Sequence, residues 1–202
     1  MQPRDIKNII PLFLVVLLCS CGSVYTNHYF LVNNHGKRTN SFGFSITPPS
    51  GIGWYEKLNK KSLYYLKKTD LATHVIYTKA TEIHLQPQML DKRKFMQFVT
   101  DYKKINTQKG NIKNITFRLV PYTLLSPFCV RYVQKYEDHG RGGKNTNRYN
   151  KVTNRGLVCM HPDAPLNGVD MYYAEITRYS PQKKYKSYQD EGEKFLNSLT
   201  FF

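Results

Sequence analysis

The side chains best suited to acid–base or metal chemistry lie in two pairs, each near the end of a predicted strand. Asp138 and His139 follow one strand, and His161 and Asp163 lie just past Cys159 of the next. A metal site needs three or four convergent ligands, whereas a hairpin made of these strands would hold the two pairs at opposite ends. We therefore predict no metal site and no cofactor. A hydrolase or metal-dependent enzyme that uses His161 and Asp163 is the alternative.

Nucleophilic and paired-carboxylate catalysis have no support in the sequence. The serine elbow pattern G-x-S-x-G is absent. The acidic residues Glu137, Asp138 and Glu175 do not form a paired-carboxylate spacing that indicates a glycosidase. We predict that the protein is not an enzyme.

Two of the four cysteines are placed to form a disulfide. Cys129 and Cys159 lie in the predicted strands 127–137 and 151–162, and Lys144 is midway between them. A hairpin folded about Lys144 would bring the two thiols face to face. Closing a loop of about 30 residues stabilises a fold by roughly 3 kcal/mol in the chain-entropy model. The alternative, a reactive thiol pair or metal site, lacks a C-x-x-C motif.

The chain is strongly basic, with a formal net charge of +16. This charge favours an anionic partner, and the long loop 140–155 is the best candidate to bind it. Its basic residues are Arg141, Lys144, Arg148, Lys151 and Arg155. No nucleic-acid-binding motif is present, so nucleic acid is not expected. The alternative is a solvated lysine-rich surface that binds nothing.

The chain contains 16 tyrosines, and several of them lie beside lysine or arginine. Such a surface is suited to contact with a glycan or a protein. The alternative is that strand composition explains most of them, because tyrosine is among the residues preferred in strands. The tyrosines concerned are Tyr55, Tyr64, Tyr65, Tyr102, Tyr149, Tyr179, Tyr185 and Tyr188.

The N-terminus has the order of a secretory signal, with charged residues followed by the apolar run 9–18. That run is too short for a permanent membrane span, which needs about 20 residues. A bacterial lipobox is resembled by the segment at the end of this run, which reads Leu18-Cys19-Ser20-Cys21 and is followed by Gly22. The resemblance implies cleavage before Cys21 and acylation of that cysteine. An ordinary signal peptide with Cys21 merely nearby is the alternative.

The lipobox resemblance also predicts where the protein lies. More than one acyl chain gives stable membrane anchoring, and Gly22, in place of an aspartate retention signal, favours the outer membrane. We expect a lipoprotein at the periplasmic face of that membrane. Its expected role is a non-enzymatic binding or assembly module that contacts an anionic envelope polymer or an envelope protein. In this setting the alternative enzyme would be an envelope hydrolase.

The elements that must position these residues form one predicted domain, 41–202, after a signal peptide at 1–20 and a tether at 21–40. Within the tether, the apolar residues 29–32 indicate either a short docked strand or an interfacial contact. Amphipathic helices are expected at 91–106, capped by Asp91, and at 185–198. Alternating residues predict strands at 42–46 and 169–179. Residues that favour strands predict an antiparallel hairpin of 62–67 with 73–85. Strands are also expected at 112–122 and in the two cysteine segments, and these three strands form a meander with 169–179.

Both ends of the predicted domain resemble the PsbP-like family. The resemblance lies in Gly43-Phe44-Ser45-Ile46 with Pro49 and Gly53-Trp54, and in Phe195-Leu196-Asn197-Ser198-Leu199. It implies an α+β fold in which a single antiparallel sheet is sandwiched by helices. It implies no activity, because the family's functional residues have no counterpart here. The segment 156–163 also resembles a stretch of small proteobacterial lipoproteins.

Overall fold

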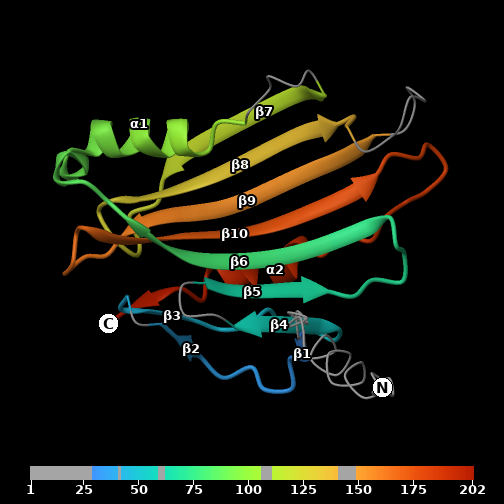
Figure 1. The fold of residues 1–202 in the computed structure, drawn as a ribbon, viewed down its shortest axis with the longest axis horizontal. Helices are drawn as coiled ribbons and strands as arrows, with labels where there is room; N and C mark the ends of the chain where they lie inside the picture. The colour runs from blue at the N-terminus through green and yellow to red at the C-terminus, as the bar shows by residue number, and fades with distance from the viewer. Residues whose placement is uncertain (1–28, 41, 59–61, 106–110, 141–148) are drawn as a thin grey trace, which may run out of the picture.

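The computed structural model describes residues 29–40, 42–58, 62–105, 111–140 and 149–202, and the chain is mostly β. Eight strands form one antiparallel sheet, the large sheet, in the order β1-β4-β5-β6-β10-β9-β8-β7, and three short strands form the small sheet, β11-β3-β2 (Figure 1). The strands of the large sheet are β1 (Phe30–Leu31), β4 (Trp54–Leu58), β5 (Ser62–Lys67), β6 (His74–His84), β7 (Ile112–Pro121), β8 (Cys129–Asp138), β9 (Asn150–Met160) and β10 (Asn167–Arg178). Those of the small sheet are β2 (Arg38–Thr39), β3 (Phe44–Ile46) and β11 (Thr200–Phe201).

Seven of the eight strands of the large sheet form two meanders that meet side by side. β4, β5 and β6 form the first, and β7, β8, β9 and β10 form the second. They join where β6 pairs with β10, from His74 opposite Thr177 to His84 opposite Asn167. The hairpin predicted for 62–67 with 73–85 is confirmed as β5 with β6, and the predicted meander is confirmed as β7, β8, β9 and β10.

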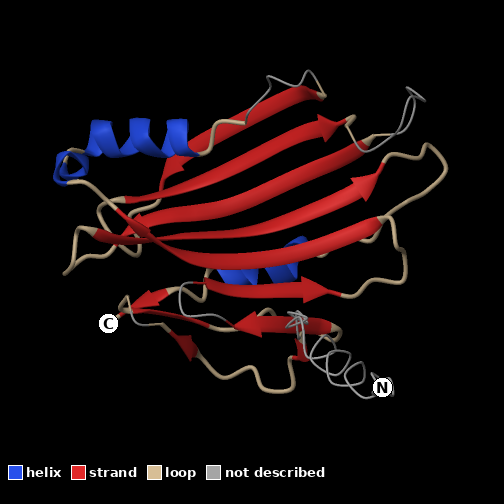
Figure 2. Cartoon of the chain, in the orientation of Figure 1, coloured by secondary structure: helices blue, strands red, loops and turns tan. Residues whose placement is uncertain are grey.

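The predicted fold class, an α+β sandwich with helices packed on a single sheet, is wrong. Strand accounts for 47% of the structure and helix for 15%, and a second sheet is present. The two α-helices have 11 and 8 residues, so the longer spans about 16 Å, whereas eight strands span roughly 38 Å. Two short helices cannot form layers over both faces of such a sheet (Figure 2).

Alternating burial separates the two faces of the large sheet, as in β5, where every second side chain is buried. One side, which we call the α2 face, carries Tyr65 and Tyr173. Helix α2 (Gln189–Leu196) packs on this side, where the ring centroids of Phe195 and Tyr65 are 5.8 Å apart. Gly192 of α2 also lies against the Tyr173 ring. The core of this side continues into the small sheet through Phe44.

The opposite side, the α1 face, is covered only near one end by helix α1 (Lys92–Tyr102), which follows a short 3-10 helix, η2 (Pro87–Leu90). The Asp91 side chain caps α1 by accepting a hydrogen bond from the Lys94 backbone N–H at 2.9 Å, as predicted. Phe95 and Val99 of α1 are buried against a cluster that includes Val158. Among the described residues, no helix lies over the middle of this face (Figure 1).

The stretch expected to be a tether contributes to both sheets. β1 pairs with β4 and β2 pairs with β3, and Val32 belongs to the main core with 8% of its surface exposed. Of the two interpretations of residues 29–32, the docked strand is the one observed. In the part of the chain that the structure describes, no helix is long and apolar enough to cross a membrane.

Candidate anion-binding site

A basic hollow lies on the α2 face of the outer strands β7, β8 and β9. Its cations are Arg118, Lys135 and Arg155, and its volume is about 330 Å³. Arg118 is opposite Val133, which is in turn opposite Arg155. Because neighbouring strands are about 4.8 Å apart, the two arginine backbones are about 10 Å apart on one row of the sheet. We call this site the basic hollow.

Strand alternation and the short reach of α2 explain why these cations are available. On β8, Tyr132 and Gln134 are buried on the α1 face, so Val133 and Lys135 point to the α2 face. α2 lies over Tyr173 of β10, nearer the centre of the sheet. Arg118 and Lys135, on the two outermost strands of this side, are therefore exposed to solvent.

Two carboxylates close to the hollow already have partners. Arg131 of β8 forms an ion pair with Glu193 of α2. Glu175 of β10 accepts hydrogen bonds from His74, at 2.7 Å, and from the Tyr173 hydroxyl, at 2.8 Å. Among the described residues, the three cations of the basic hollow have no ion-pair partner. Their charges are left to attract an anion from solution.

The structure places two of the five predicted binding residues on this face. Arg155 lines the basic hollow. Lys151 lies four residues earlier on β9, about 13 Å along the strand, with its Nζ 4.8 Å from the Tyr179 ring centroid. The other three, Arg141, Lys144 and Arg148, lie outside the described residues.

Arg118 and Lys135 were not predicted as site residues. Alternation along β7 and β8 was the available signal, because it places each of them on a defined face of its strand. The register that brings them beside Arg155 comes from pairing between strands, and a single sequence does not show which face α2 leaves open.

The predicted hairpin register places Cys129 opposite Cys159, and the structure joins them in a disulfide. Both residues are buried, with 2% and 0% of their surface exposed, in the core under the α2 face. The bond therefore fixes β8 to β9 at the end opposite the predicted binding loop. A burial of this kind is typical of a structural cystine and not of a reactive thiol pair.

His161 is a buried structural residue between the end of β9 and the small sheet. Its Nδ1 accepts hydrogen bonds from the backbone N–H groups of Asp163 and Ala164, both at 3.1 Å. Its Nε2 lies 3.2 Å from the Gly43 carbonyl and 3.3 Å from the Phe202 carbonyl, and donating to them requires the neutral Nε2-H tautomer. Both ring nitrogens are thus used within the fold, which argues against a catalytic His161.

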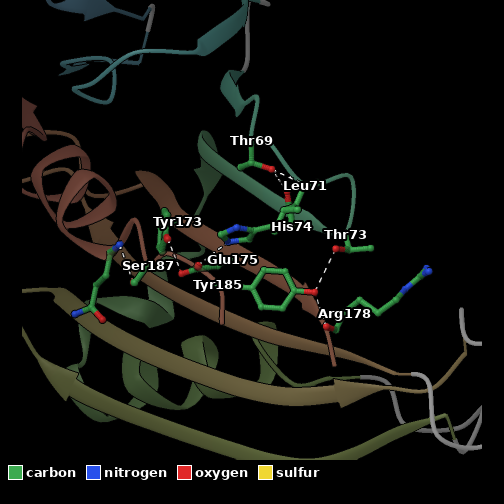
Figure 3. Close-up of polar contacts among 10 residues, drawn as sticks. Thr69, Leu71, Thr73, His74, Tyr173, Glu175, Arg178, Tyr185 and Ser187 are labelled. Atoms are coloured by element: carbon green, nitrogen blue, oxygen red, sulfur yellow. Dashed lines mark hydrogen bonds and ion pairs between the residues drawn. The ribbon is translucent and has the colours of Figure 1, made fainter. Parts of the chain in front are cut away.

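A second polar cluster, around His74, resembles a catalytic arrangement more closely. The imidazole and the Tyr173 hydroxyl both bind Glu175, and Tyr185 lies over the His74 ring at 5.2 Å (Figure 3). Burial and the neighbouring Glu175 carboxylate raise the pKa of Tyr173. His74 is itself buried, and Tyr185 is tied to Thr73 and to the Arg178 carbonyl. The cluster fastens the segment before α2 to the sheet.

Among the residues that the structure describes, no group of three or more His, Cys, Asp or Glu residues is able to hold a metal ion. Comparison with known proteins adds no assignment to this site. The chain matches no protein-family model, and a search of curated proteins finds no significant relative.

Proposed function

We propose that the protein is a lipid-anchored binding module of the bacterial cell envelope, held at the periplasmic face of the outer membrane through Cys21. In this proposal it is not an enzyme. Its basic hollow binds an extended anionic component of the envelope, either a polymer or the acidic surface of a partner protein. The lipobox resemblance supports the address, and the basic hollow supports the activity.

The observation that carries the proposal is the group of three cations around one open hollow, without a carboxylate partner in the described residues. Two arginines on a rigid sheet suit phosphate or carboxylate oxygens, because the planar guanidinium binds such groups through two parallel hydrogen bonds. A separation of about 10 Å along one row favours a ligand with several charges over a single small anion.

Calorimetric titration with soluble polyphosphate tests the activity. We expect Arg118→Gln/Lys135→Gln/Arg155→Gln to weaken binding by at least about tenfold, with a smaller salt dependence, because charge pairs across a binding site are lost. Polyglutamate in a parallel titration distinguishes phosphate from carboxylate preference.

A matched control removes three cations from the opposite side of the molecule. Arg93, Lys94 and Lys104 lie in or just after α1 and are exposed. Replacing all three by glutamine changes the net charge equally and should leave affinity nearly unchanged. Equal weakening in both triple variants would show that only total charge matters, and the assignment of the basic hollow would be wrong.

Mass spectrometry of the protein purified from its native membrane, without reduction, tests the address. The proposal expects a chain that begins at Cys21 and carries diacylglycerol and an amide-linked acyl group, with Cys129 bound to Cys159. A chain that still begins at Met1, or an unmodified Cys21, would overturn the anchor while leaving the binding test unaffected.

A further inference from the structure

The α1 face carries a hollow of about 340 Å³ over the middle of the large sheet, on the side away from the basic hollow. It lies between strands β6, β10, β9 and β8 and the end of α1. We call it the tyrosine hollow and define it by Tyr77, Tyr132, Tyr172, Lys103, Asp170 and Asn154. Its volume falls within the range of small-ligand sites, about 300–1,000 Å³.

A row of tyrosine rings extends from the tyrosine hollow towards the edge of the sheet. Tyr172 lies 5.9 Å from Tyr77, Tyr77 lies 5.7 Å from Tyr64, and Tyr64 lies 6.2 Å from Tyr29, between ring centroids. Tyr29 and Tyr64 line a second hollow of about 210 Å³, which shares Lys79 with the first. The two hollows form a path long enough for a chain-like ligand.

Fixed polar groups line the floor of the tyrosine hollow. Gln134 donates from Nε2 to the Lys103 carbonyl at 2.8 Å, and Asn154 donates from Nδ2 to Gln134 Oε1 at 3.2 Å. These bonds set the orientation of both amides. Asn154 Oδ1 and Thr81 Oγ1 are buried without a hydrogen-bond partner in the described structure. A few oriented polar groups among aromatic rings are what gives a small-ligand site its specificity.

The charges of the tyrosine hollow do not favour an anion. Lys103 Nζ lies 2.6 Å from each oxygen of Asp170, and Tyr102 donates to the same carboxylate at 3.1 Å. The positive charge of Lys103 is therefore balanced by the Asp170 carboxylate. Its ammonium group is packed among aromatic rings, including that of Tyr132, whose centroid is 4.7 Å from Nζ. Lys79 supplies a further positive charge, but the Asp170 carboxylate would repel phosphate.

We propose that the tyrosine hollow and the adjoining ring path bind a neutral or N-acetylated oligosaccharide. A pyranose ring has an apolar CH face, which packs on tyrosine, and hydroxyl groups around its rim, which bind amide, hydroxyl and carboxylate side chains. An apolar peptide would leave the Asn154 and Thr81 oxygens without partners, which costs free energy. The site is independent of the basic hollow.

Titration with cellotetraose, maltotetraose, xylotetraose, mannotetraose and chitotetraose tests the proposal, with intrinsic tyrosine fluorescence and calorimetry as readouts. At least one sugar should bind. Tyr172→Ala and Asn154→Ala should each lower the affinity for that sugar by about tenfold, because one ring or one hydrogen-bonding group is lost. Tyr77→Phe should retain most of the affinity, because it keeps the ring.

Tyr179→Ala is the matched control, because Tyr179 stacks on Tyr149 at 4.6 Å and lies outside both hollows. Circular dichroism would show that each variant is folded. The proposal is overturned if none of the five sugars binds at about 10 mM, a level that detects even weak carbohydrate affinity. It is equally overturned if Tyr172→Ala and Asn154→Ala bind as tightly as Tyr179→Ala.

Discussion

At the residue scale, Lys103 shows how the fold holds a cation away from water. Its side chain is 12% exposed and that of Asp170 is 6% exposed. Burial lowers the pKa of Lys103, and the Asp170 carboxylate opposes that shift. The ion pair therefore keeps a charged lysine inside the structure and fixes the wall of the tyrosine hollow.

Removing only the carboxylate should be strongly destabilising. We expect Asp170→Asn to lower the free energy of unfolding by on the order of 3 kcal/mol, because Lys103 is left buried without a counter-charge. The double variant Lys103→Met/Asp170→Asn should recover much of this loss. Urea unfolding measures both, and an Asp170→Asn protein as stable as the unmodified one would show that Lys103 escapes to solvent.

Buried tyrosines predict a loss of stability at alkaline pH. Burial raises the pKa of Tyr64 from 10.0 to about 12, and it also raises the pKa of Tyr65, Tyr132 and Tyr172. A raised pKa in the folded state contributes stability that is fully present below pH 10 and is lost as the pH rises through the raised value. The lowered pKa of Lys103 changes stability with pH in the opposite direction, but Lys103 is one group against several tyrosines.

The expected result is a folded protein whose buried tyrosines stay protonated between pH 10 and about 12, with a free energy of unfolding that falls across this window. Tyrosinate absorbance, followed together with circular dichroism, measures both quantities. Titration of every tyrosine near pH 10 while the protein remains folded would contradict the burial of these rings.

Residue-scale prediction from the sequence succeeded where the signal was local. Asp91 was expected as a helix cap because a short acidic side chain can accept from the first turn, and it does so. Cys129 and Cys159 were paired by their equal distance from Lys144. Arg118 and Lys135 were missed, because a single sequence shows neither the register of β7 with β8 nor which face of these strands α2 leaves open.

At the element scale, α2 is positioned by a residue that has no side chain. Gly192 is buried, and a Cβ atom there would lie 2.4 Å from Tyr173 Cγ. An aromatic ring held by the Tyr173–Glu175 hydrogen bond cannot move aside easily. The close approach of α2 to β10 therefore depends on glycine.

Gly192→Ala should destabilise the protein, although the same change within a helix normally stabilises it by about 0.5–1 kcal/mol. We expect a loss of about 1–3 kcal/mol from overpacking against Tyr173. Thermal unfolding is the measurement, and Gly192→Ala/Tyr173→Leu should restore part of the loss. A higher melting temperature for Gly192→Ala alone would mean that α2 is not packed this closely.

At the scale of the whole molecule, the individual strands and helices could be predicted from the sequence. The number of strands that join in one sheet could not. Strand-favouring composition in 62–67 and period-two alternation in 169–179 indicated strands correctly. The resemblance to a sandwich fold then suggested more helical cover than two short helices provide. The join of β6 with β10 pairs residues 83 to 103 positions apart, and no local pattern specifies it.

In the part of the chain that the structure describes, one large sheet has two regions that no helix covers, on opposite faces and with different chemistry. The basic hollow presents cations without partners in the described structure. The tyrosine hollow presents rings and oriented amides around a neutralised lysine. A sheet with short helical cover is suited to display both, since broad strands hold side chains at fixed spacings.

The central claim, that an anion binds the basic hollow, is tested most directly by NMR chemical-shift mapping with soluble polyphosphate. The largest changes are expected in the backbone amides of Thr116–Arg118, Val133–Lys135 and Thr153–Arg155, with little change on the α1 face. Shifts confined to the loop 141–148, shifts centred on the tyrosine hollow, or none at all would contradict the claim.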